Sequence, residues 1–223
     1  MAKMSFFPVS NPDELLELVN EVGFLPFFKN EIEGFSLEEH TAPGFWFNDD
    51  VEGPWEWKAT LSKSQKCAYG KCFDKKAGYV SLKWYPHLAN YRRCGYDFDA
   101  KYDDGLVSMD EKRVMDTLLE YGPLLSFDLK KLSHCQKSFD SIMTKLQMQT
   151  YVTSANFEYR VDKHGNQYGW GVGRYAISEQ WLGEEICIGQ YDIDPKESFE
   201  MIIDHLIELM PYADEKKLRR FMR

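Results

Sequence analysis

The chain has 223 residues, 43% of them hydrophobic and 15% aromatic, so it can bury a core and is too apolar to stay disordered. No apolar run approaches the length of about 20 residues that a membrane-spanning helix needs, and the N-terminus lacks a signal-peptide pattern. Five cysteines without a CxxC pair indicate free thiols in a reducing compartment. We therefore expect a cytoplasmic globular protein of one large or two small domains.

The net charge of −9 disfavours nucleic-acid binding, but this charge is unevenly distributed along the chain. Residues 58–93 carry nine basic groups and one acidic group, and residues 129–175 carry seven basic and three acidic groups. A phosphate backbone responds to the local field, which salt screens over about 8 Å, rather than to the total charge. The two basic segments either form one DNA-binding face or remain separate solvated faces.

A helix is predicted over residues 11–22, because Pro12 suits its first turn and apolar residues recur on one face. The hydrophobic stretch at residues 24–28 is expected in the core. Residues 34–60 are rich in Trp and Phe, and within them residues 51–57 are expected to form a strand or a loop. Such aromatic density favours a packed core over a base-stacking surface.

The most cationic part of the chain, residues 61–93, interleaves lysines with aromatic residues, which suits phosphate contacts beside packed rings. It contains a strand predicted at residues 78–82 and a helix predicted to end at residues 92–93. Residues 95–105 hold four aspartates but do not fit a calcium-binding loop, because Tyr102 stands where glycine is needed. An acidic turn is expected there, with a carboxylate acting as a general base as the functional alternative.

Three helices followed by a β-hairpin are predicted in the next part of the chain. A capping box begins the first helix, over residues 108–121, and a shorter helix follows at residues 124–132. Apolar residues at helical spacing predict the third helix, over residues 139–150, and strict alternation predicts a hairpin over residues 157–175. This order is that of a winged helix, a variant of the helix-turn-helix.

Three glycines of the predicted hairpin, Gly169, Gly171 and Gly173, lie on one strand face and leave bare backbone that another element or a ligand can approach. Further on, a proline in the first turn and apolar residues at helical spacing predict a helix over residues 194–210. Residues 214–223 can form a last short helix with a basic end.

Together these elements predict an α+β fold built on a winged helix-turn-helix, single or in tandem. Residues 1–107 form an aromatic- and Lys/Arg-rich N-terminal part that can hold a second, degenerate winged helix. Residues 108–176 form the winged helix with its hairpin wing. Residues 177–223 form a C-terminal helical segment packed on the core.

The string from Thr144 to Tyr151, TKLQMQTY, resembles the AlkZ-type DNA glycosylases, bacterial winged-helix proteins that excise N7-alkylated guanine and carry two glutamines around an apolar residue. Other stretches resemble a shorter AlkZ-related group; they are residues 69–71, 75–78, 90–93, 95–99 and 168–172. The resemblance implies a protein that binds double-stranded DNA and excises N7-alkylated purines, with Gln147 and Gln149 as the catalytic residues. It implies no metal and no cofactor.

Helix geometry sets a condition on this glutamine pair. Residues two positions apart on a helix are rotated by about 200° around its axis. Both amides can therefore address one substrate only if the helix has ended or kinked by Leu146. If the helix continues, Gln147 and Gln149 end an ordinary helix and contact solvent or phosphates.

Basic and aromatic side chains from both cationic segments are the predicted contacts to DNA. They are Lys71, Lys75, Lys76, Arg92, Arg93, Lys145, Trp170 and Arg174. The alternative function is a non-catalytic winged-helix binding module, such as a regulator or a protein-interaction domain.

Overall fold

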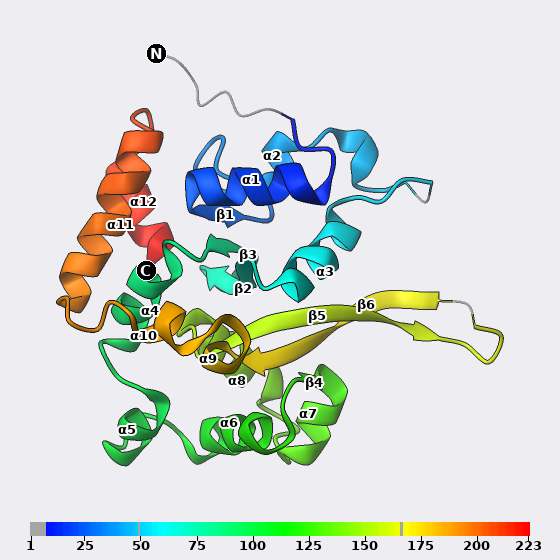
Figure 1. The fold of residues 1–223 in the computed structure, drawn as a ribbon, viewed down its shortest axis with the longest axis vertical. Coiled ribbons are helices and arrows are strands. Elements are labelled where there is room, and N and C mark those ends of the chain that lie inside the picture. Colours follow the sequence, from blue (N-terminus) through cyan, green and yellow to red (C-terminus); the bar gives the residue numbers. More distant parts are fainter. Residues whose placement is uncertain (1–7, 49, 166) are drawn as a thin grey trace.

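The computed structural model describes residues 8–48, 50–165 and 167–223, and it has a mixed α/β fold with two small antiparallel sheets (Figure 1). The strands are β1 (Phe24–Pro26), β2 (Cys67–Phe73), β3 (Lys76–Ser81), β4 (Leu124–Leu125), β5 (Val152–Val161) and β6 (Gln167–Ile177). One sheet has the order β1-β3-β2 and the other has the order β4-β6-β5.

Helices surround both sheets (Figure 1). They are α1 (Pro12–Val22), α2 (Leu37–His40), the 3₁₀ helix η1 (Pro43–Phe45), α3 (Pro54–Ser64), α4 (Tyr85–Arg93), α5 (Phe98–Asp103), α6 (Met109–Tyr121), α7 (Ser126–Leu132), α8 (Phe139–Met148), α9 (Ser178–Leu182), α10 (Glu184–Ile188), α11 (Pro195–Leu209) and α12 (Glu215–Met222). No helix in the described part of the chain is long and apolar enough to cross a membrane.

The first sheet is covered on both faces, because successive side chains of a strand point to opposite sides. Tyr79 of β3 packs in a cluster with α1 and α3, whereas its neighbour Val80 packs in a second cluster with α4, α11 and α12. Gly78 permits close packing within this sheet, since a Cβ there would lie 2.5 Å from the Phe73 ring and 2.7 Å from the Leu25 carbonyl oxygen. The C-terminal helices are therefore part of the same core as the N-terminal sheet.

The start of α3 corrects the expectation of a strand or loop at residues 51–57. Pro54 occupies the first helical position, and the Glu56 carboxylate accepts a hydrogen bond from the Gly53 N–H at 2.9 Å. Trp57 and Leu61 then share one buried face of the helix. These N-terminal signals outweigh the strand preference of the aromatic residues.

The aspartate-rich stretch at residues 95–105 also differs from expectation, because it forms the short helix α5 rather than a turn. The Asp97 side chain accepts a hydrogen bond from the Ala100 N–H at 2.7 Å and caps the helix. Phe98 packs into the third cluster of the core, edge-on to Tyr151. One of the four aspartates therefore has a capping role that its spacing alone did not indicate.

The second half of the chain follows the predicted order of three helices and a hairpin. Ser108 and Glu111 form the expected capping box of α6, and Gly122 ends that helix. The third helix, α8, ends at Met148, two residues before the predicted end. The short strand β4 was not predicted and pairs with β6. Two hairpin glycines that were expected to leave a bare face are covered, because Phe157 lies against both Gly171 and Gly173.

Candidate functional site

The glutamine pair does not meet the condition for a joint site, because α8 stays helical beyond Leu146. Gln147 is buried; its Oε1 accepts a hydrogen bond from the Lys71 N–H at 3.2 Å, and its Nε2 donates to the Met143 carbonyl at 2.9 Å. A Cβ on Gly70 would lie only 3.3 Å from that Oε1, so β2 approaches the amide closely. Gln147 therefore fastens α8 to β2.

Gln149 occupies a different environment. It is the residue that ends α8, and its N–H donates to the Lys145 carbonyl at 2.9 Å. Its side-chain Oε1 is buried and has no hydrogen-bond partner among the described residues. Since about 200° of helix rotation separates it from Gln147, the two amides do not share one substrate-facing surface.

Arg92 and Arg93 are predicted as DNA contacts, whereas the structure turns both guanidinium groups inward. Arg92 donates to the carbonyl oxygens of Met148 at 3.0 Å and Met222 at 2.6 Å. Arg93 is 0% exposed, donates to the Thr150 carbonyl at 2.6 Å and forms an ion pair with Glu179. Burial lowers the pKa of Arg93, but the ion pair outweighs this effect and raises that pKa above its usual value. Neither guanidinium is therefore placed to neutralise a DNA phosphate.

The predicted lysines, in contrast, come together around the C-terminal half of α8. The Lys71 ammonium donates to the Thr144 hydroxyl at 3.1 Å, and the Lys75 N–H lies 3.3 Å from the Met148 sulfur. Lys76 is the first residue of β3 and is exposed. Lys145 projects from α8 itself and pairs with Glu111 at 2.7 Å. We call this set of four lysines, from β2, the β2–β3 turn, β3 and α8, the α8 basic surface.

Trp170 and Arg174 lie on β6, away from this surface. The Arg174 guanidinium donates to Glu158 at 2.6 Å and to the Pro123 carbonyl at 2.8 Å, so it ties the hairpin to the loop before β4. The hydrogen bond that Arg174 donates to Glu158 raises the pKa of Arg174. Trp170 is exposed and contacts Trp55 of α3.

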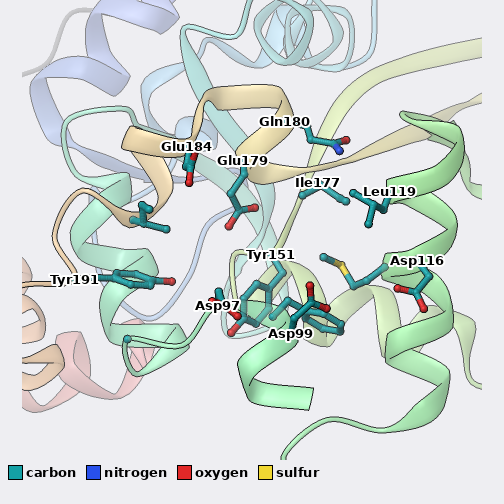
Figure 2. Close-up of a pocket in the computed structure, with 14 residues that line it drawn as sticks. Asp97, Asp99, Asp116, Leu119, Tyr151, Ile177, Glu179, Gln180, Glu184 and Tyr191 are labelled. Atoms are coloured by element: carbon teal, nitrogen blue, oxygen red, sulfur yellow. The ribbon is translucent and has the colours of Figure 1, made fainter. Parts of the chain in front are cut away.

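A cleft of about 570 Å³ opens beside the end of α8, between α5, α6, α9 and α10 (Figure 2). Three aromatic rings, from Phe98, Tyr151 and Tyr191, contribute to its wall. Five carboxylates also line it; they are Asp97, Asp99, Asp116, Glu179 and Glu184. Among the described residues, no lysine or arginine is part of this lining. The cleft therefore favours a ligand that is positively charged and partly apolar.

Tyr151 links the glutamine-containing helix to this cleft. Thr150 adopts a left-handed backbone with φ of 63°, which turns the chain after α8 and places Tyr151 in the cleft wall. The Tyr151 hydroxyl donates to the Tyr96 carbonyl at 3.0 Å, and the Arg93 guanidinium lies 4.5 Å from the centre of its ring. Burial raises the pKa of Tyr151, although Arg93 opposes this shift, so the phenol is neutral.

Glu179 is the carboxylate whose position is best defined within the cleft. It is the second residue of α9, its side chain is 27% exposed, and one of its oxygens pairs with Arg93. Figure 2 shows the carboxylate pointing from α9 into the cleft, towards Tyr151. A carboxylate held in this way can accept a proton or attract a cation. The sequence predicts a general base only among the aspartates of residues 95–105, and no local motif marks Glu179.

The aspartates of the cleft are tied to neighbouring groups in other ways. Asp97 caps α5, and Asp99 lies 3.5 Å from the Lys112 ammonium, which also pairs with Asp116. The described residues contain no group of three or more His, Cys, Asp or Glu side chains arranged to hold a metal ion. Glu179 is thus the carboxylate that a buried cation orients, while the aspartates are held near the rim.

Comparison with known families gives one result. A family model described as AlkZ related matches residues 9–223. The chain belongs to the AlkZ-related family. Membership covers nearly the whole chain and confirms the resemblance to the AlkZ-related group. No match to the chain is found among curated proteins or among solved structures.

Proposed function

We propose that this AlkZ-related protein binds double-stranded DNA through a winged helix made of α6, α7, α8 and the β5–β6 hairpin. Three helices precede the hairpin, and the short strand β4 pairs with β6, which is compatible with winged-helix topology. The relation of the family to DNA repair supports the same proposal. α8 takes the place of the recognition helix.

The observation that carries the proposal is the α8 basic surface. Lys71 and Lys75 contact α8, which itself carries Lys145, although 70 positions separate Lys75 from Lys145 in the sequence. β2 covers the Gln147 side of α8, so that side of the helix cannot enter a DNA groove. Binding therefore relies on phosphate contacts and depends weakly on DNA sequence.

DNA binding is tested by fluorescence anisotropy with a short labelled duplex between about 50 and 200 mM salt. The double variant Lys75→Ala, Lys76→Ala is expected to reduce the slope of log affinity against log salt by about 2, because each lost phosphate contact lowers it by about 0.9. Lys196→Ala, at the exposed start of α11, is the matched control and is expected to retain the slope. Absent or salt-independent binding by the unmodified protein contradicts the proposal.

A second candidate function is the excision of N7-alkylated purines in the cleft. An N7-alkylguanine is flat and positively charged, which fits aromatic walls and five carboxylates. In this reaction Glu179 accepts a proton from a water whose oxygen attacks C1′ of the nucleotide. The glycosidic bond breaks, and its electron pair leaves with the base, which becomes neutral. Gln147 has no direct part, since it is buried against β2.

Base excision is tested by measuring free base released from a duplex that contains N7-methylguanine. Glu179→Gln is expected to reduce the rate at least about 100-fold, the usual effect of losing a general base. Glu120→Gln, on an exposed part of α6 outside the cleft, is the control for a simple change of charge. No release by the unmodified protein, or full activity of Glu179→Gln, rejects excision and leaves DNA binding as the function.

A further inference from the structure

A second hollow lies on another part of the molecule, between η1, the start of α3 and the β5–β6 hairpin. Its volume is about 550 Å³, and we call it the aromatic groove. The side chains that matter for its chemistry are Trp46, Phe47, Trp55, Tyr159, Tyr168 and Trp170. None of these residues belongs to the α8 basic surface or to the cleft.

The aromatic groove exposes large rings that the fold itself does not bury. Phe47 is 85% exposed, Trp170 is 74% exposed and Tyr168 is 52% exposed. The Trp170 ring centre lies 5.7 Å from that of Trp55, so the rings face a common space rather than being scattered. Exposed aromatic patches of this kind mark binding sites, because covering the rings removes apolar surface from water.

Trp46 provides an unused hydrogen-bond donor in the wall of the aromatic groove. It is 7% exposed, and its indole N–H has no acceptor among the described residues. The neighbouring Trp55 is different, since its indole N–H donates to the Trp46 carbonyl at 3.1 Å. A buried N–H without an acceptor destabilises the free protein, so a ligand carbonyl that reaches it removes a cost already present there.

The charge around the aromatic groove decides what kind of ligand fits. Residues 45–57 contain four acidic residues and no basic residue. Lys58 lies over the rings of Trp55 and Phe157, and burial lowers its pKa to about 8. Grooves for single-stranded nucleic acid are positively charged, so phosphates are disfavoured here. A neutral or basic ligand is favoured instead.

A proline-rich peptide matches each of these properties. Its extended left-handed helix docks in grooves lined by aromatic rings, and its backbone carbonyls are not bonded to one another, so one can accept from the Trp46 N–H. A lysine or arginine beside the prolines can approach the Glu56 carboxylate, which lines the same groove. We propose that the aromatic groove binds a proline-rich peptide segment that carries a basic residue.

The test uses the full chain and a decaproline peptide that ends in arginine, with binding followed through the indole N–H signals in NMR spectra. Titration is expected to shift the Trp46 signal, which the Trp46→Phe variant identifies among the six tryptophans. Trp46→Phe is expected to weaken binding about fivefold, because it removes one hydrogen bond. Trp170→Ala is expected to weaken binding at least about tenfold, as for an exposed aromatic anchor.

Three results separate this proposal from its alternatives. Tyr121→Ala removes an exposed aromatic residue at the end of α6 and is expected to leave peptide affinity unchanged. A decaproline peptide that ends in glutamate is expected to bind more weakly than the arginine peptide. Tighter binding of an oligothymidylate than of the arginine peptide overturns the proposal, as does full affinity of Trp170→Ala, whose exposed side chain is not needed for folding.

Discussion

Replacement of Arg93 by methionine tests the buried connection between α4, the end of α8 and α9. The guanidinium is 0% exposed, donates to the Thr150 carbonyl and hydroxyl at 2.6 and 3.0 Å, and pairs with Glu179. Breaking a buried ion pair from one side costs about 3 to 5 kcal/mol. The Glu179 side chain is 27% exposed and can be hydrated once its partner is lost, so we expect the lower end, about 3 kcal/mol.

The reverse replacement, Glu179→Gln, is expected to cost more, about 4 kcal/mol, because it leaves the fully buried Arg93 cation without a counter-ion. The double variant is expected to lose at least about 1.5 kcal/mol less than the sum of the two single losses, since neither partner is then left alone. This non-additivity distinguishes an ion pair from two independent packing defects.

Stability is measured by urea unfolding at neutral pH, with tryptophan fluorescence and circular dichroism as probes. A loss of 3 kcal/mol corresponds to a fall of about 6 to 12 °C in melting temperature for a chain of this length. Arg113→Met removes an exposed pair with Asp110 on α6 and is expected to cost less than about 0.5 kcal/mol. A loss below about 1 kcal/mol for Arg93→Met, or additive single losses, refutes the reasoning.

Three further replacements test other contacts. Gln147→Leu leaves the Lys71 N–H without its acceptor and is expected to lower the free energy of unfolding by about 2 kcal/mol. Duplex affinity is expected to change less than about twofold. An unchanged melting temperature contradicts the role of Gln147 in fastening α8 to β2. Burial raises the pKa of Glu111, but the Lys145 contact and the capping hydrogen bonds outweigh burial, so the net shift of this pKa is downward. The Glu111 carboxylate therefore stabilises the fold above pH 4.5, and this stabilisation is lost as the pH falls through the lowered pKa. Acid unfolding of Glu111→Gln should therefore be less steep, and equal slopes are the contrary result. Burial lowers the pKa of Lys58 to about 8, so the charge on Lys58 destabilises the fold below that pH. In urea titrations, the free energy of unfolding of the wild type should therefore rise relative to that of Lys58→Met as the pH increases from 8 to 10.5.

Local signals in the sequence determined most helices. Asn11 caps α1 through its side chain, and Ser108 with Glu111 forms the capping box of α6, the latter as its spacing predicts. The misassigned stretches are informative as well. At residues 51–57 a first-turn proline and a capping glutamate outweighed aromatic strand preference, and at residues 95–105 one aspartate became a helix cap. In each case a short-range interaction in the first helical turn decides the local structure.

Side-chain direction, in contrast, was decided only by tertiary packing. The sequence predicts Arg92 and Arg93 as surface cations. In the structure, α4 packs so that both guanidinium groups point inward and donate to carbonyl oxygens, and that of Arg93 also pairs with Glu179. Gln147 reads as a polar helix end, yet β2 approaches it across the bare backbone of Gly70. Charge and polarity are properties of the sequence, whereas exposure depends on which element lies alongside.

The sequence by itself determined the membership of the AlkZ-related family, which the family model confirms, and it determined the order of three helices and a hairpin. Only the tertiary structure decided what surrounds the glutamine-containing helix. The α8 basic surface joins lysines from β2, β3 and α8, and the cleft gathers carboxylates from α5, α6, α9 and α10. Residues so far apart in the chain carry no common local pattern, because it is long-range packing of the hydrophobic clusters that brings them together.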